Sequence, residues 1–244
     1  MSGSRSSEAA ALPPLAPRDR AANPAWIERG YRATERRGPE KPLVALPEVA
    51  STVPAPDFSW LLLTENDADL TRNGRLNGDP LGERIVISGR VLDEQGRPVA
   101  GTIVELWQAN AAGRYRHPVD DHDAPLDPNF LGAGRCRTDS GGRYRFLTIR
   151  PGAYPWRNHR NAWRPAHLHF SLFGRHFADR LVTQVYFPGD PLLAYDPIYL
   201  SVPEAARDRL VARFDLGLTV EGVALGYAFD FVLRGPSATP WEGG

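Results

Sequence analysis

The chain of 244 residues is 42% apolar and carries 29 basic and 29 acidic side chains, so its formal net charge at neutral pH is zero. This length fits one β-rich core with an arm better than two domains. A balanced charge provides no field that would attract nucleic acid or an anionic membrane. Cys136 is the single cysteine, which excludes an internal disulfide framework and cysteine-based zinc or iron–sulfur sites. Without a signal-like start or an apolar run of membrane length, the chain is expected to be soluble and cytoplasmic.

The N-terminal part, residues 1–75, is predicted to be an extended arm and lead-in. Up to about residue 56 it is rich in Ala, Pro, Arg and Ser and has little apolar periodicity, which disfavours a packed unit. Trp26 and Tyr31 lie within it, and solvating tails seldom contain large aromatic side chains. Such an arm is either disordered or wraps a partner, and the aromatic side chains favour docking.

Residues 76–240 are predicted to be all-β, a β-sandwich of antiparallel strands with one or two short helices. Short strand-like runs alternate with turns rich in Gly, Pro and Asp. Such repeated hairpins build sandwiches or barrels. The clearest strand is the last, in which large apolar side chains recur at every second residue. The predicted strands are 84–92 paired with 101–110, 134–139 paired with 143–149, and 227–234.

One helix is predicted over residues 201–214, SVPEAARDRLVARF. Ser201 and Glu204 have the spacing of a capping box. Ala206, Leu210 and Phe214 recur every four residues, as expected for the buried face of a helix. We expect a single helix packed beside the sheets.

The stretch 161–170, NAWRPAHLHF, places His167 and His169 two residues apart in a strand-like run. Alternate side chains of a strand share a face, so both imidazoles would project together while Ala166, Leu168 and Phe170 face the core. This geometry suits two ligands of one metal ion. It also suits two hydrogen-bonded histidines on a polar sheet face, and a short H-x-H motif does not decide between the two.

Two groups of residues are candidates to complete such a metal site. The acidic loop with Asp120, Asp121 and Asp123 offers carboxylates for a two-His-plus-carboxylate centre, although a loop with Pro125 and Pro128 is more simply explained as a solvated turn. Tyr115 and Tyr154 lie in loops bounded by Gly and Pro, where functional residues are common. Either tyrosine alone also fits a structural role in anchoring its loop.

Three ordered segments, residues 104–158, 163–170 and 181–191, resemble the intradiol ring-cleaving dioxygenases. The similarity extends in order over about residues 80–235, and more weakly to ERGYRATERR at 28–37. Within that family it is greatest to the iron-bearing beta chain of the members that act on protocatechuate. The resemblance implies cleavage of 3,4-dihydroxybenzoate by O2 to 3-carboxy-cis,cis-muconate, in the beta-ketoadipate pathway of aromatic catabolism.

The resemblance also implies a ligand set for a non-haem Fe(III) ion. It comprises the tyrosines of GRYRH and AYPWRN and both histidines of HLHF, which are Tyr115, Tyr154, His167 and His169. Phenolate is a hard anionic ligand that suits ferric iron. In the family the tyrosine of the YPW stretch is displaced by the substrate, which implies that Tyr154 is both a ligand and a base.

Further roles follow from the same resemblance. Arg164 would be the cation that stabilises negative charge on the substrate ring, the alternative being a surface salt bridge. Gln184 would donate or accept a hydrogen bond in the pocket, the alternative being a polar residue of a half-exposed strand.

The substrate pocket of an aromatic acid needs a flat apolar slot with few polar groups. Tyr31, Trp156 and Ile198 are predicted to line it. Trp107 is instead expected to lie in the core.

Two alternative functions remain open from the sequence. One keeps the chemistry and changes the ring, to catechol, chlorocatechol or hydroxyquinol. The other is a non-catalytic β-sandwich used for assembly, which the presence of all four ligand positions disfavours. In either catalytic case the resemblance implies an alpha subunit of similar fold as partner in a hetero-oligomer, with no nucleic acid or membrane involved.

Overall fold

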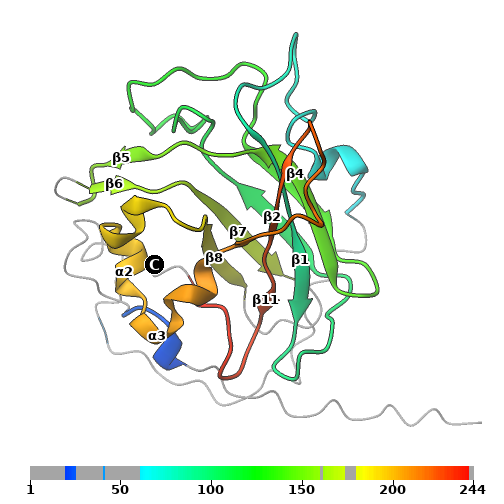
Figure 1. The fold of residues 1–244 in the computed structure, drawn as a ribbon, viewed down its shortest axis with the longest axis vertical. Helices are drawn as coiled ribbons and strands as arrows, with labels where there is room; N and C mark the ends of the chain where they lie inside the picture. The colour runs from blue at the N-terminus through cyan, green and yellow to red at the C-terminus, as the bar shows by residue number, and fades with distance from the viewer. Residues whose placement is uncertain (1–19, 26–40, 42–60, 160–161, 174–179, 242–244) are drawn as a thin grey trace, which may run out of the picture.

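The predicted β-sandwich is confirmed by a computed structural model, which describes residues 20–25, 41, 61–159, 162–173 and 180–241 (Figure 1). The two α-helices lie together at one side of the sheets. In chain order the elements are η1 (Arg20–Ala22), η2 (Glu65–Ala68), β1 (Arg84–Leu92), β2 (Ile103–Trp107), β3 (Ala133–Arg137), β4 (Arg143–Ile149), β5 (Tyr154–Trp156), β6 (Ala162–Arg164), β7 (His167–Phe173), β8 (Leu181–Tyr186), η3 (Pro191–Ala194), α2 (Pro197–Ser201), α3 (Glu204–Arg207), η4 (Asp208–Leu210), β9 (Arg213–Phe214), β10 (Leu225–Ala228) and β11 (Phe231–Val232).

The strands form two larger sheets and one small one. The first sheet has the order β11-β1-β10-β9, with β4 also paired to β1, and the second has the order β3-β2-β7-β8. Strands β5 and β6 form a separate two-stranded ladder. Most pairings are antiparallel, but β10 and β11 both lie parallel to β1. The sandwich is therefore mixed rather than purely antiparallel.

The two predicted hairpins are wrong. Strand β1 pairs with β4, β10 and β11, whereas β2 pairs with β3 and β7. After each turn the chain crosses to the opposite sheet, because both sheets must cover one shared core. That core joins Ile87 and Phe146 of the first sheet to Leu106 and Phe170 of the second. Turn residues indicate where a strand ends, but they do not indicate which sheet the next strand joins.

Aromatic rings occupy the centre of this core. Tyr144, Phe146, Phe170 and Phe231 contact one another with ring centroids 5.0–6.2 Å apart. The Tyr144 hydroxyl donates a 2.7 Å hydrogen bond to the Phe229 carbonyl oxygen, which satisfies the one polar group among them. Burial raises the pKa of Tyr144 well above its ordinary value, so this hydroxyl remains a donor.

The single helix predicted over residues 201–214 is also wrong. The segment contains the end of α2, then α3 and η4, and finally β9. Ser201 donates its hydroxyl hydrogen bond to the Ile198 carbonyl oxygen instead of capping a new helix, and Val202 is extended. Pro203 is the N-cap of α3, which begins at Glu204, and proline disfavours helix in the residue before it. Across the described ranges no helix is long and apolar enough to traverse a membrane.

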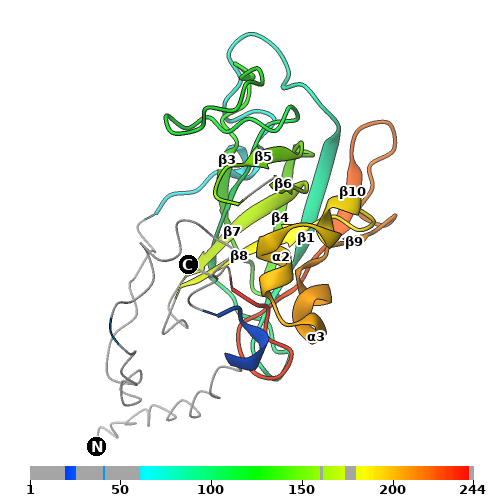
Figure 2. The ribbon, with the colours of Figure 1, turned by 90° about the vertical axis from the view of Figure 1, so that its left-hand side faces the viewer.

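Helix η1, at the start of the described chain, lies close to α3 (Figure 2), and a small second core joins them. Ala22 of η1 is buried there with Val202, Ala206, Leu210 and Tyr186. Because Tyr186 belongs to β8, this cluster fastens α2 and α3 to the edge of the second sheet.

The last predicted strand is interrupted at a point where three segments meet. Strand β10 ends at Ala228 and β11 begins at Phe231, and the side chain of Asp230 accepts a 2.7 Å hydrogen bond from the Arg90 backbone N–H. A Cβ atom on the adjacent Gly89 would lie 1.7 Å from the Phe229 carbonyl oxygen. The close approach of these backbones therefore requires glycine at position 89.

Substitution Gly89→Ala is expected to lower the free energy of unfolding by about 2 kcal/mol or more, because the added methyl group forces the backbones apart. Chemical denaturation measures the change. The matched control is Gly78→Ala, where the nearest atom to a new Cβ is 3.4 Å away; this variant should change stability by less than about 1 kcal/mol. Equal effects of the two substitutions would contradict the packing assigned to Gly89.

Candidate active site with a four-donor cluster

The two histidines of β7 lie on the outer face of the second sheet. Leu168 and Phe170, which alternate with the histidines along the strand, are buried in the core, as the strand period predicts. The Nε2 atoms of His167 and His169 are 3.2 Å apart. Both side chains are largely shielded from solvent, with 1% and 9% of their surface exposed.

Two tyrosines reach the same point from different loops. The Tyr115 hydroxyl oxygen lies 3.0 Å from His169 Nε2 and 3.5 Å from His167 Nε2. The Tyr154 hydroxyl oxygen lies 3.3 Å from His167 Nε2, and the two phenol rings meet edge to face at 5.3 Å. All four residues that the resemblance indicated are thus brought together, although their positions in the chain span Tyr115 to His169.

The protonation of His167 follows from its surroundings. Its Nδ1 atom is 2.7 Å from the Pro165 carbonyl oxygen, which can only accept, so Nδ1 carries the proton and Nε2 has a free lone pair. Burial, and then the charges of Arg164 and His169, hold the pKa of His167 well below its ordinary value. A neutral imidazole with a fixed Nε2 lone pair is the form that binds metal ions.

The spacing of the four donor atoms fits a shared cation. Bonds of about 2.1 Å from one ion place neighbouring donors about 3.0–3.4 Å apart, depending on the coordination geometry, and the observed separations are 3.0–3.5 Å. His167 Nε2 has three such neighbours but only one lone pair. Hydrogen bonds alone cannot satisfy all these contacts at once, whereas one metal ion can.

Trp107 supports the cluster from the neighbouring strand. It is directly opposite His169 in the β2–β7 register, and the indole and imidazole rings stack at 4.9 Å with 7° between their planes. The expectation that Trp107 lies in the core is wrong, because it is half-buried on the outer face. Leu106 of β2 faces the core, so strand alternation could have placed Trp107 outside.

Arg164 is buried beside the cluster rather than at the surface. Only 2% of its surface is exposed, and in the β5–β6 ladder it is paired with Tyr154. Its Nε atom donates to Asp196 Oδ1 at 2.8 Å. Burial alone lowers the pKa of this guanidinium, but Tyr186 and Asp196 outweigh that effect and raise the pKa above its ordinary value. The group therefore stays charged, and the surface salt bridge considered for it is excluded.

Trp107, His169 and Gln184 lie side by side on β2, β7 and β8 of the second sheet. Gln184 is opposite His169 in the β7–β8 register and is 2% exposed, not half-exposed. Its Oε1 atom accepts hydrogen bonds from Arg164 Nη2 and, at 3.1 Å, from the Tyr186 hydroxyl. Within the described part of the chain, its buried Nε2 atom has no hydrogen-bond partner. A buried amide donor without a partner is costly, which makes it a suitable contact for a ligand.

The acidic loop has a structural role in the fold. Asp120 accepts hydrogen bonds from the backbone N–H groups of Tyr115 at 2.7 Å and His122 at 2.9 Å. Its carboxylate also lies 3.9 Å from Arg114 Nε. Among the residues that the structure describes, no group of three or more His, Cys, Asp or Glu side chains could hold a metal ion. The two-His-plus-carboxylate alternative therefore has no support there, and Asp120 instead holds the loop that carries Tyr115.

Two of the three predicted pocket residues lie in the described part of the chain. The ring of Trp156 lies 5.6 Å from the Arg164 guanidinium carbon, which sits over it. Ile198 is half-buried in α2, and its backbone N–H donates to Asp196. Tyr31 lies outside the described residues, so its predicted role stays a prediction.

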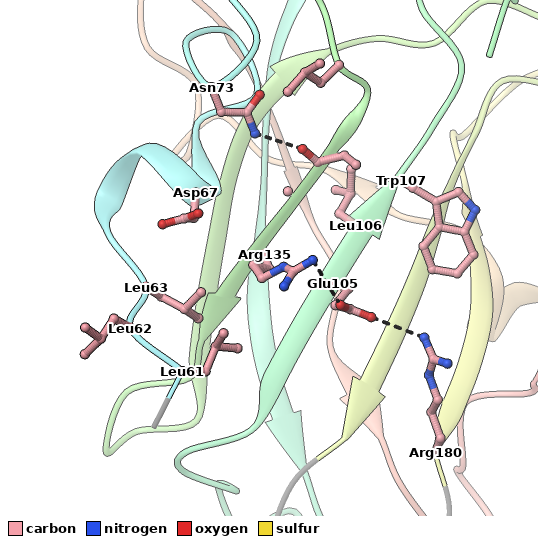
Figure 3. A pocket seen from close by; sticks show the side chains of 13 residues that line it. Leu61, Leu62, Leu63, Asp67, Asn73, Glu105, Leu106, Trp107, Arg135 and Arg180 are labelled. Carbon is pink, nitrogen blue, oxygen red and sulfur yellow. Dashed lines mark hydrogen bonds and ion pairs between the residues drawn. The ribbon is translucent and has the colours of Figure 1, made fainter. Parts of the chain in front are cut away.

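A separate groove of about 580 Å³ lies further along the outer face of the second sheet (Figure 3). Its floor carries Glu105 between Arg135 and Arg180, with charge separations of 3.6 Å and 3.2 Å, and Leu61, Leu62 and Leu63 line its side. Trp107 borders it, but none of the four clustered donors lines it. The groove is thus a neighbour of the site and not the site itself.

Comparisons with known proteins identify the family of this chain. A family profile described as Dioxygenase matches residues 53–235. The protocatechuate 3,4-dioxygenase beta chain of Burkholderia cepacia is 64% identical over 228 residues, which cover 93% of this chain and 97% of that protein. The chain belongs to the intradiol dioxygenase family. Within that family, its similarity to the protocatechuate 3,4-dioxygenase beta chain extends over almost the full length of both proteins.

Other members are more distant. Hydroxyquinol 1,2-dioxygenase of Rhizobium sp. (strain MTP-10005) is 34% identical over 56% of this chain and 46% of its own length. The crystal structure of 3-chlorocatechol 1,2-dioxygenase from Rhodococcus opacus 1CP has a TM-score of 0.53 and 27% identity, covering 68% of this chain and 64% of that one. These relatives support the fold and the family, but their similarity spans a smaller part of the chain.

Substitution Asp120→Asn is expected to loosen the loop that carries Tyr115, because a charged acceptor of two backbone N–H groups is lost. The free energy of unfolding should fall by about 1–2 kcal/mol, and the metal content after dialysis should fall with it. Thermal unfolding and metal analysis measure the two effects. The control is Asp121→Asn, whose carboxylate is 64% exposed and pairs with an exposed Arg157; a loss as large as that of Asp120→Asn would contradict the role of Asp120.

Proposed function

We propose that this chain is the iron-bearing subunit of an enzyme that cleaves protocatechuate with O2 between its two hydroxylated carbons. The product is 3-carboxy-cis,cis-muconate, an intermediate of aromatic catabolism in the beta-ketoadipate pathway. The observation that carries the proposal is the convergence of Tyr115, Tyr154, His167 and His169, in which each donor atom lies 3.0–3.5 Å from at least one other. It occurs in a chain that is 64% identical to a protocatechuate 3,4-dioxygenase beta chain.

The four residues would hold a non-haem Fe(III) ion. Two phenolates and two imidazoles form a donor set that favours the ferric over the ferrous state, because hard anionic oxygen suits the more highly charged ion. When bound, this ion supplies Lewis acidity that makes the catechol hydroxyls acidic and activates the ring toward oxygen. Trp107 and the Pro165 carbonyl would keep the two imidazoles in their binding orientation.

Tyr154 would act as a base as well as a ligand. Its phenolate oxygen can accept a proton from a substrate hydroxyl when the substrate takes its place. Arg164 lies opposite Tyr154 in the β5–β6 ladder, and its charge interacts with that tyrosine. The same charge would stabilise negative charge that develops on the substrate ring.

The polar contacts of the substrate are also assigned by proposal. Gln184 has a buried Nε2 donor with no partner in the described ranges, which makes it available to a substrate oxygen. Trp156, Ile198 and, in the arm, Tyr31 would line the aromatic slot.

Protocatechuate is favoured over the other rings by the extent of similarity. The hydroxyquinol dioxygenase matches only 56% of this chain, whereas the protocatechuate enzyme matches 93%. Catechol, chlorocatechol and hydroxyquinol are therefore the alternatives that a substrate comparison must exclude. A non-catalytic assembly subunit is the alternative of a different class, and it would not need the four-donor cluster.

The proposal also covers the subunit assembly of the enzyme and its cellular compartment. The name of the Burkholderia cepacia relative as a beta chain supports an alpha subunit of similar fold as partner, in a hetero-oligomer. The arm and lead-in at residues 1–75, preceding the catalytic domain at 76–240, are proposed to contact that partner. A lone, unpaired Cys136 suits a reducing compartment, and we propose that the enzyme is cytoplasmic.

The purified protein is expected to contain iron and to be coloured, because charge transfer from tyrosinate to Fe(III) absorbs visible light. Substitution Tyr115→Phe should remove most of the visible band and lower the iron content several-fold, as measured by absorption and metal analysis. Tyr195→Phe is the matched control, since Tyr195 is 74% exposed, and it should leave both unchanged. A colourless wild-type protein with a full complement of iron would refute the ligand set.

Turnover of protocatechuate is expected to exceed that of catechol by at least tenfold in kcat/KM when the chain is assayed with its alpha partner. A missing substrate carboxylate leaves polar groups of the pocket unpaired, which costs about 1–3 kcal/mol. Oxygen uptake and product absorption measure both rates. Equal or faster turnover of catechol would shift the assignment to the catechol alternative without affecting the iron site.

A further inference from the structure

Asp196 is the most deeply buried acidic side chain of the site region. None of its surface is exposed, and its partner Arg164 is 2% exposed. The pair is bidentate, with Arg164 Nε to Asp196 Oδ1 at 2.8 Å and Nη2 to Oδ2 at 3.2 Å. A buried ion pair contributes little net stability, because removing two charges from water offsets their attraction. Its geometric precision therefore points to a role in placing the guanidinium.

The remaining contacts of Arg164 leave one of its nitrogens available. Nη2 also donates to Gln184 Oε1 and, at 3.2 Å, to the Tyr186 hydroxyl. One face of the group covers the ring of Trp156. Within the described part of the chain, Nη1 is the guanidinium nitrogen for which no hydrogen bond is found.

Asp196 also connects the guanidinium to helix α2. Its carboxylate accepts hydrogen bonds from the backbone N–H groups of Ile198 at 3.3 Å and Tyr199 at 3.4 Å, as an N-cap residue does. The ring of Tyr199 meets Tyr186 edge to face at 5.2 Å. A single carboxylate thus joins the proposed catalytic cation to the helix that carries the proposed pocket residue Ile198.

We propose that Asp196 is a positioning residue of the reaction: it locks Arg164 so that Nη1 alone remains to contact the substrate. The inference rests on the proposed function, because it requires Arg164 to act on the reacting ring. Asp196 touches no reacting atom itself and acts through Arg164. A planar fork held at Nε and Nη2 cannot rotate, so Nη1 is presented in one direction.

The test is Asp196→Asn in the assembled enzyme, compared alone and in an Arg164→Gln background. Asparagine keeps the shape and one acceptor oxygen but loses the charge and the bidentate grip. In the wild-type background kcat for protocatechuate should fall about 10- to 100-fold, while KM changes less than about threefold. In the Arg164→Gln background the same substitution should change kcat less than about twofold, because coupled residues are not additive.

Binding and structure provide readouts that do not depend on turnover. Anaerobic addition of protocatechuate to Asp196→Asn should still shift the visible spectrum, and the iron content should equal that of the wild type. A crystal structure of the variant should show the Arg164 guanidinium displaced from Trp156. A kcat within threefold of the wild type, or an equal loss in both backgrounds, would overturn the proposal and leave Asp196 only as a helix cap.

Asp127→Asn is the control for removing a buried carboxylate that accepts backbone hydrogen bonds. Asp127 accepts from the N–H groups of Leu81 at 2.7 Å and Asn129 at 2.8 Å, and Arg164 is not among its partners. This variant should lose stability without a comparable fall in kcat. If the wild-type enzyme itself does not turn over protocatechuate, the proposed function fails, which is distinct from a failure confined to Asp196.

Failure of Asp196→Asn to fold also decides the question. The double variant Arg164→Gln, Asp196→Asn has no unpaired buried charge, so it should fold and be at least as stable as Arg164→Gln, which leaves the buried Asp196 carboxylate without its partner. Recovery of folding in the double variant would support the coupling of the two residues. A double variant that also fails to fold would overturn the proposal, since Asp196 would then stabilise the fold independently of Arg164.

Discussion

The alternation of side chains along β7 is the constraint on which the site depends. Leu168, Phe170 and Leu172 are buried in the sandwich core, and this burial sets which way the strand faces. A shift of one residue in register would exchange the two faces, so core packing is also what directs His167 and His169 outward. The hydrophobic effect that stabilises the sandwich therefore positions the two imidazoles.

The surroundings of the cluster are organised by buried charge. Arg164 is held by Asp196, Gln184 and Tyr186, and Asp196 in turn caps α2. In a region of low dielectric, a charged group without partners is costly. This network keeps a cation beside Tyr154 at a fixed position, and it links the β5–β6 ladder, β8 and α2 into one frame around the proposed substrate.

Much of the fold could be predicted from the sequence, because strand composition and turn residues are local patterns. The strands at 84–92 and 143–149 were correctly placed by their composition and turn residues. The pairing of consecutive strands was predicted wrongly, since a hairpin and a crossover between sheets begin with the same turn signals. The helix at 201–214 was also wrong: α3 begins only after Pro203, and the end of the segment forms β9, which pairs with β10, a tertiary contact that helical periodicity does not report.

The sequence by itself determined the family and the identity of the four proposed ligands, since Tyr115, Tyr154, His167 and His169 stand in ordered motifs. Their assignment as ligands remains a proposal. Only the tertiary structure decided that their donor atoms meet within 3.0–3.5 Å, and that Trp107 and Asp196 support the site. These two residues come from β2 and from the N-cap of α2. Strand alternation can place Trp107 on the outer face, but its contact with His169 and that of Asp196 with Arg164 depend on register and burial, which join segments distant in the chain.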